Sequence, residues 1–226
     1  MLPLVRLLQL ASPALPVGAY TYSQGLEWAV ESGTVRDEAG AAQWIEDLLH
    51  WGVSAFEAPL VAAAMMAWEA GNAVEVQRLN EDFLASRESR ELRQEAEQMG
   101  HSLVRLLRDL HEFAALPGWR ARLMDLETPS FPLAWSAAAA AWQIPREMAV
   151  TGYLWAWLEN QVMAAVKLVP LGQSAGQRLL ARLGAHLPTL AQAAVSRPER
   201  EWTNFLPGFA MASVSHETQY SRLFRS

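Results

Sequence analysis

Apolar residues recur at helical spacing through most of this sequence. The clearest stripe lies within residues 80–113, where successive apolar residues are four, three, four, three and four positions apart. This spacing places their side chains on one face of a helix. Such a face has to be buried against other elements, so the stripe predicts helices that pack together. Its members are Leu92, Ala96, Met99, Leu103, Leu106 and Leu110.

Strict alternation of apolar and polar residues is missing from the sequence, which predicts little or no β-sheet. The expected fold is all-α: a single-domain helical bundle of roughly eight to ten helices over residues 1–226. We expect a flexible N-terminal segment and a C-terminal docking tail at about residues 208–226. Loops are expected at Pro117-Gly118 and over residues 128–132. Helices are expected at residues 24–32, 39–50, 56–70, 80–113, 133–142, 146–167, 175–184 and 187–195.

Composition narrows the functional classes. The net charge of -6 argues against a nucleic-acid binder, which needs clustered Lys and Arg. With no cysteine, thiolate catalysis and Cys-based zinc sites are excluded. Arg6 interrupts the apolar N-terminus, and Glu159 and Lys167 interrupt the apolar stretch 148–169, so neither a signal peptide nor a membrane span is expected. The sequence predicts a soluble, cytoplasmic protein.

The stretch Gly172-Gln173-Ser174-Ala175-Gly176 matches the G-x-S-x-G pattern of a serine hydrolase. That motif requires a strand before the serine and a helix after it, whereas helical periodicity precedes Ser174. A triad would need His186 or His216 with a downstream glutamate. Ser174 and Gln177 also match a capping box at the start of a helix. We prefer the capping box and keep the hydrolase using Ser174 as the alternative function.

No local spacing predicts a metal or nucleotide site. The histidines show no H-x-H or H-E-x-x-H pattern, and no phosphate-binding glycine loop is present. No metal ligand is therefore predicted. The five histidines are His50, His101, His111, His186 and His216.

Three polar or aromatic stretches each leave two interpretations open. Tyr20 and Tyr22 follow a turn rich in proline and glycine, and are either buried structural residues or interface residues. The Arg and Glu residues of "SRESRELRQEAEQMG" form either a solvated helix face or a partner-facing one. The C-terminal "SVSHETQYSRLFRS" carries aromatic residues, so it either packs on its own domain or becomes ordered on docking.

Taken together, three stretches resemble the urease accessory protein UreF family. They are "LLQLASPALPVGAYTYSQGLEWAVESG", "KLVPLGQSAGQRLL" and "SHETQYSRLFRS", with weaker support from "SRESRELR". The resemblance runs from end to end of the chain and is loose between residues 118 and 148.

The resemblance implies an all-helical, non-catalytic protein that assists maturation of nickel urease. It implies a homodimer that binds UreD (UreH in some organisms), recruits the GTPase UreG and docks on apo-urease. Nickel and GTP are then expected on the partner proteins, and a GTPase-regulating role is a further implication. Lys167 is expected to reach an acidic partner surface. The matching positions, all candidates for partner contact, are Tyr20, Tyr22, Ser23, Gln24, Gly25, Glu27, Lys167, Gly172, Gln173, His216, Glu217, Gln219, Tyr220, Arg222, Phe224 and Arg225.

The chain also departs from the family pattern. Many members have a histidine where Gln24 stands, and a His-Pro pair where this chain has Ser130-Phe131-Pro132. No metal-binding role is therefore expected at these positions.

Overall fold

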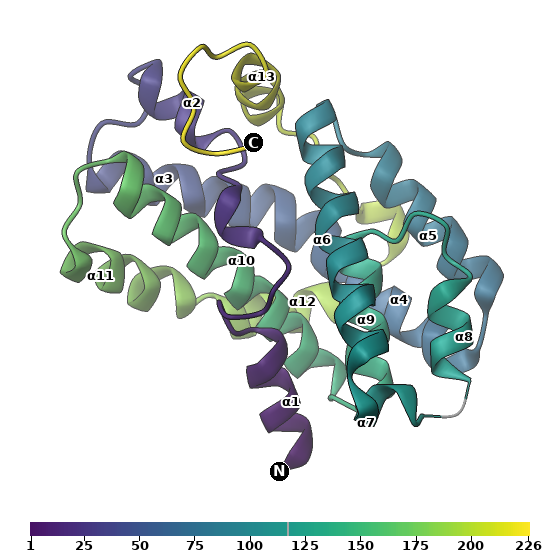
Figure 1. Cartoon of the computed structure of the whole chain (residues 1–226). Helices are drawn as coiled ribbons and strands as arrows, with labels where there is room; N and C mark the ends of the chain where they lie inside the picture. Colours follow the sequence, from purple (N-terminus) through teal and green to yellow (C-terminus); the bar gives the residue numbers. More distant parts are fainter. Residues whose placement is uncertain (117) are drawn as a thin grey trace.

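A computed structural model describes residues 1–116 and 118–226, and over these residues the chain is helical without any strand (Figure 1). The predicted all-α class is confirmed. The loop expected at Pro117-Gly118 falls partly outside the described residues, at Pro117.

Over residues 1–116 and 118–226, ten of the thirteen α-helices have nine residues or more, within the expected range of eight to ten. They are α1 (Leu2–Leu10), α3 (Glu38–Leu48), α4 (Ala58–Ala70), α5 (Ala73–Ala85), α6 (Arg90–Asp109), α9 (Phe131–Ala141), α10 (Arg146–Leu168), α11 (Gln173–Gly184), α12 (Leu187–Ser196) and α13 (Pro207–His216). Shorter segments are α2 (Leu26–Glu31), α7 (His111–Ala114), α8 (Trp119–Met124), the 3-10 turns η1 (Ala19–Thr21) and η3 (Glu199–Glu201), and the π-helical η2 (Leu49–Glu57).

Two helices predicted as separate, at 39–50 and 56–70, form one continuous helix through η2. The reason lies at Pro59, whose nitrogen cannot donate and whose ring would collide with the Ala55 carbonyl in a regular α-helix. The wider π-turn upstream relieves this collision, and Ala58 N–H bonds to Val53 O instead. The Ala55 carbonyl accepts from Thr203 N–H at 3.3 Å, so it is not left unpaired.

The single helix predicted over residues 80–113 is wrong at its start. The chain leaves α5 after Ala85 and enters α6 at Arg90, because Ser89 caps the new helix by accepting from Leu92 N–H at 3.1 Å. The prediction is also wrong at its end, because α6 stops at Asp109, Leu110 has an extended backbone, and Leu106 is half-buried. Leu92, Ala96, Met99 and Leu103 are all buried.

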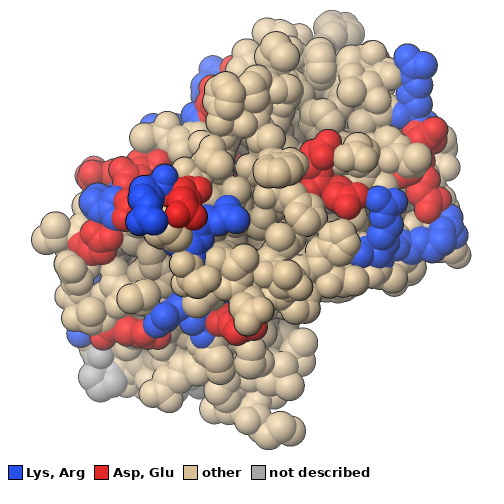
Figure 2. All heavy atoms as spheres, turned by 180° about the vertical axis from the view of Figure 1, so that it is seen from behind, with Lys and Arg blue, Asp and Glu red and all other residues tan. Residues whose placement is uncertain are grey.

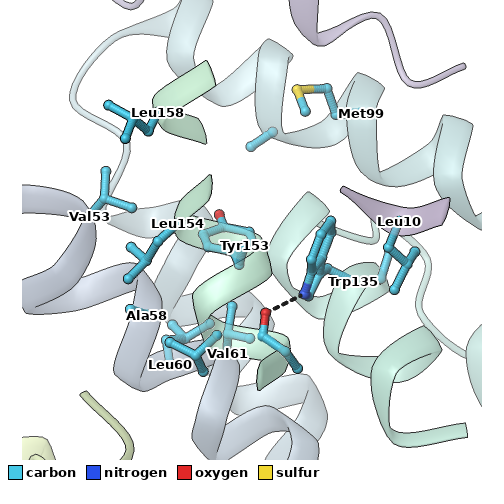
Figure 3. Close-up of a cluster of buried hydrophobic side chains, with 14 of the residues drawn as sticks. Leu10, Val53, Ala58, Leu60, Val61, Met99, Trp135, Tyr153, Leu154 and Leu158 are labelled. Atoms are coloured by element: carbon cyan, nitrogen blue, oxygen red, sulfur yellow. Dashed lines mark hydrogen bonds between the residues drawn. The ribbon is translucent and has the colours of Figure 1, made fainter. Parts of the chain in front are cut away.

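The core lies around α9, which packs against α4 and α6, and around α10, which packs against α4, α11 and α12. The alanines 137–140 of α9 are buried and let neighbouring helices approach closely. Trp135 is fully buried, and its indole donates to the Ala149 carbonyl at 3.3 Å, the dashed line in Figure 3. Gly100 of α6 lies so close to Pro129 that any Cβ there would collide with the Pro129 carbonyl. The residues before α9 are thereby held against α6.

One helix, Glu38–Ala70, is long and apolar enough to cross a membrane by length and composition alone. It is not the stretch 148–169 that the sequence singled out. Because 67% of its most apolar window is buried inside the protein, it has the character of a core helix.

The two chain ends were not predicted as helical, yet α1 and α13 form there. In Figure 1, α1 lies at one end of the molecule, while α13 and the residues after it lie beside α2 at the other. On the face shown in Figure 2, positive and negative side chains are interspersed and separated by broad uncharged areas. Neither sign of charge therefore dominates the electrostatic potential of that face.

Candidate functional site

The C-terminal residues are held by one buried carboxylate, that of Glu27 in the first turn of α2. Its Oε1 accepts from Leu223 N–H at 2.5 Å, and its Oε2 accepts from Phe224 N–H at 2.9 Å. The Nε2 of His216 lies 3.1 Å from the same Oε2. Gly25 makes this approach possible, because it adopts φ 77° and a Cβ there would lie 3.2 Å from Ser213 N.

His216 lies fully buried between two carboxylates. Its Nδ1 is 2.7 Å from Oε2 of Glu91, opposite the contact with Glu27. A neutral imidazole has only one N–H, so both contacts are hydrogen bonds only if the ring, or one carboxyl, carries the extra proton. Arg222 donates to the other oxygen of Glu91 at 2.6 Å and adds positive charge to the cluster. With both ring nitrogens engaged, His216 acts as a structural link.

The tail also caps the start of α6. Oε1 of Glu217 accepts from the backbone N–H of Arg90 at 2.7 Å and of Glu91 at 3.3 Å. These donors have no partner within the helix, and a carboxylate is favourable at the positive end of the helix dipole. Ser89 shares a 2.6 Å hydrogen bond with Ser213 of α13. The middle stretch of the sequence thus joins the two ends.

The last residues run beside residues 21–23. Ser23 donates to the main-chain oxygen of Ser226 through its N–H at 2.7 Å and its Oγ at 2.5 Å. Arg225 N–H donates to the Thr21 carbonyl at 2.8 Å. The Tyr22 hydroxyl donates to Gln98 Oε1 at 2.8 Å, and burial raises the pKa of this phenol, which keeps it a donor. Gly25 is the N-cap of α2, and Ser23 Oγ accepts from the Glu27 N–H at 3.3 Å.

Aromatic and apolar side chains border this junction. Phe224 is buried, and the Lys167 ammonium lies 5.4 Å from its ring centroid, a cation–π contact. Tyr20, Tyr220 and Leu223 are exposed, with relative solvent accessibilities of 67%, 105% and 66%. The tail packs on its own chain through Phe224 and presents Tyr220 and Leu223 outward.

Two predicted positions contribute less to the junction. Gln219 donates to the Ser221 carbonyl at 3.0 Å, which shapes the turn after α13. Gln173 is exposed at the first position of α11. Among the described residues, no hydrogen bond or ion pair joins Gln173 to the cluster.

A cavity of about 260 Å³ adjoins the junction and is lined by Tyr20, Gln24 and Lys167. Gln24 adopts φ 53° and donates to Glu95 Oε1 at 2.7 Å, while it accepts from the Trp157 indole at 2.8 Å. Ser226 Oγ donates to the second oxygen of Glu95 at 2.8 Å. The cavity wall and the tail therefore share one buried carboxyl.

The pKa of Glu95 is raised to about 7, mainly because burial disfavours its charged form. The nearby Glu57 adds to this rise. Glu57 itself is paired with Arg87 at 2.9 Å and accepts from the Tyr153 hydroxyl at 2.6 Å. Burial and the Glu57 carboxylate raise the pKa of Tyr153 well above its ordinary range.

Sequence reasoning missed Glu57, Tyr153 and Trp157. An acid inside the apolar run "AFEAPLVAAAMM" was a signal for Glu57, because a charge on a buried helix needs a partner. The segment "SRESRELRQEAEQMG" is neither wholly a solvated helix face nor wholly a partner-facing one. Arg93 and Glu97 form an exposed pair at 2.9 Å, whereas Glu91 and Glu95 are buried within the chain.

Ser174 lies in the first turn of α11, exposed, with Gly172 at the N-cap and no side-chain cap. The predicted capping box is therefore wrong. The hydrolase alternative is also unsupported, because helix α10 precedes the motif where a nucleophile elbow requires a strand. Both candidate histidines are engaged elsewhere, His216 as above and His186 with His50. Gly176 serves packing, because a Cβ there would lie 2.9 Å from Val166 of α10.

Comparison with known proteins gives this geometry a context. The UreF family model matches residues 35–184. Over its full length the chain is 71% identical to "Urease accessory protein UreF" of Azoarcus sp. (strain BH72), covering 97% of that protein, and 61% identical to that of Dechloromonas aromatica (strain RCB), covering 98%. It is 47% identical to "Bifunctional urease accessory protein UreEF" of Bordetella bronchiseptica, with 99% of this chain matching 52% of that protein. The chain therefore belongs to the UreF family of urease accessory proteins.

Proposed function

We propose that this chain is a scaffold in urease maturation whose junction of chain ends binds UreD (UreH). The UreF family is an accessory family without catalytic activity, so the prediction that the chain is not an enzyme is confirmed. In the proposal the whole chain acts as one domain in the cytoplasm. The complex with UreD then recruits the GTPase UreG to apo-urease, and nickel and GTP are held by these partners.

One observation carries the docking proposal. All four sequence stretches that resemble the family contribute to a single junction, through Glu27, Glu91, Lys167 and the tail that begins at His216. Beside this junction Tyr220 and Leu223 are exposed. Tyrosine is enriched among the residues that dominate binding energy at interfaces.

A relative supports the assembly role. In the Bordetella protein named UreEF, a region similar to this chain is continuous with a further segment. That protein is named as a bifunctional urease accessory protein. We infer that this chain likewise works beside other accessory proteins, as a homodimer within the complex.

The test uses exposed positions so that folding is unaffected. We expect Tyr220→Ala and Leu223→Ala each to weaken binding to co-expressed UreD at least tenfold, with the melting temperature unchanged. Val74→Ala is the matched control, since Val74 is 82% exposed at the start of α5. Deletion of residues 220–226 is a poorer test, because it also removes the buried Phe224. Wild-type affinity in both tail variants would contradict the proposal.

A further inference from the structure

A second cluster of side chains lies between α3–η2 and the turn from α11 to α12. Glu46 and His50 are four positions apart on one continuous helix, and so share a face. His186, at the N-cap of α12, lies opposite them, with its Nδ1 3.0 Å from Nε2 of His50. One ligand atom from each of the three residues lies within 4.8 Å of the others.

The arrangement has the chemistry of a metal site. Imidazole nitrogens bind a divalent late transition ion at about 2.0–2.1 Å, so two of them on one tetrahedral ion lie roughly 3.3 Å apart. The His50–His186 separation of 3.0 Å is close to that value. The two nitrogens cannot both carry a proton toward each other, so at least one of them presents a lone pair.

The third residue is already oriented. Oε2 of Glu46 pairs with Arg182 at 2.7 Å, which leaves Oε1 as the second oxygen of the same carboxylate. Support of a ligand carboxylate by a neighbouring donor is usual at metal sites. All three ligand residues are half-buried, so an ion could enter from solvent.

We propose that Glu46, His50 and His186 bind one divalent late first-row transition ion, of the class of Ni²⁺, Cu²⁺ and Zn²⁺. Imidazole with carboxylate suits these ions, which exceed Mn²⁺ and Fe²⁺ in affinity for such ligands. Three protein ligands leave a coordination position open, as exchangeable and catalytic sites do. The site goes beyond the proposed function, which assigns nickel to the partners. Local spacing did not predict it, because His50 and His186 are 136 positions apart.

The experiment titrates the purified full chain with Ni²⁺ and with Zn²⁺, in competition with a chromogenic chelator. We expect one ion per chain, and His50→Ala or His186→Ala to weaken binding at least tenfold. The matched controls are His101→Ala and His111→Ala, which remove exposed histidines outside the cluster and should leave affinity unchanged.

Cobalt provides a second readout. Co²⁺ bound by wild type should give intense visible absorption, and Glu46→Gln should change that spectrum, whereas Glu31→Gln, at an exposed glutamate outside the cluster, should retain it. Circular dichroism of each variant tests folding, and His186→Ala lies in a turn, so it keeps the test valid if His50→Ala fails to fold. Equal affinity of wild type and the histidine variants, or loss of binding in His101→Ala, would overturn the proposal. Neither outcome bears on UreD binding, which the tail variants test.

Discussion

The buried carboxyl of Glu95 makes a quantitative prediction about stability and pH. Its pKa rises from the ordinary value of 4.5 to about 7, chiefly through burial. Between these two pH values the unfolded chain ionises Glu95 while the folded protein retains the proton. The folded state therefore loses relative stability as the pH rises from about 4.5 to 7, and the loss is complete above 7.

The size of the loss follows from the pKa difference. Each pKa unit corresponds to about 1.4 kcal/mol, so ionised Glu95 costs the folded state about 3 kcal/mol above pH 7. Glutamine is neutral at every pH and has nearly the same shape. In Glu95→Gln, the amide oxygen can accept from Gln24, and the amide nitrogen can donate to Ser226 Oγ.

We expect Glu95→Gln to raise the free energy of unfolding at pH 8.5 by up to about 3 kcal/mol, and to change it by less than about 1 kcal/mol at pH 5. Urea titration at both pH values, followed by circular dichroism, measures the difference. In thermal unfolding the same gain would raise the melting temperature by about 6–12 °C for a chain of this size. Glu88→Gln, at an exposed position before α6, is the control and should change little. A stability difference that is the same at pH 5 and pH 8.5 would refute the reasoning.

Two further variants test the packing that forms the junction. Gly100→Ala should destabilise the fold by about 1–3 kcal/mol or more, because its Cβ collides with the Pro129 carbonyl; Gly172→Ala, where a Cβ meets open space, should not, and equal urea midpoints would contradict this account. Glu27→Gln leaves one of the tail donors at Leu223 and Phe224 without a carboxylate oxygen, which costs about 1–3 kcal/mol. We expect trypsin to cleave after Arg222 at least tenfold faster than in the exposed control Glu31→Gln, and cleavage at the control rate would count against this role.

The sequence alone determined the helical class and most of the helices. The i, i+3, i+4 spacing of Leu92, Ala96, Met99 and Leu103 depends only on the geometry of a single helix, so it could be recognised without a structure. The family resemblance was also recognisable, because its motifs are local runs of residues. Element boundaries were less certain, since Ser89 ends one helix and starts another through a cap that competes with continued helix.

What joins distant parts of the chain was decided by the tertiary structure. Glu27 contacts Phe224 across 197 positions, and His50 contacts His186 across 136, and no local spacing carries such information. The burial of individual charged residues was equally hard to predict from the sequence. Glu91 and Glu95 occur among exposed charges in the sequence, yet both lie inside, because the tail and residues 22–27 cover one side of α6. Periodicity reports which face a helix buries, whereas the partner buried against it depends on how all the helices pack.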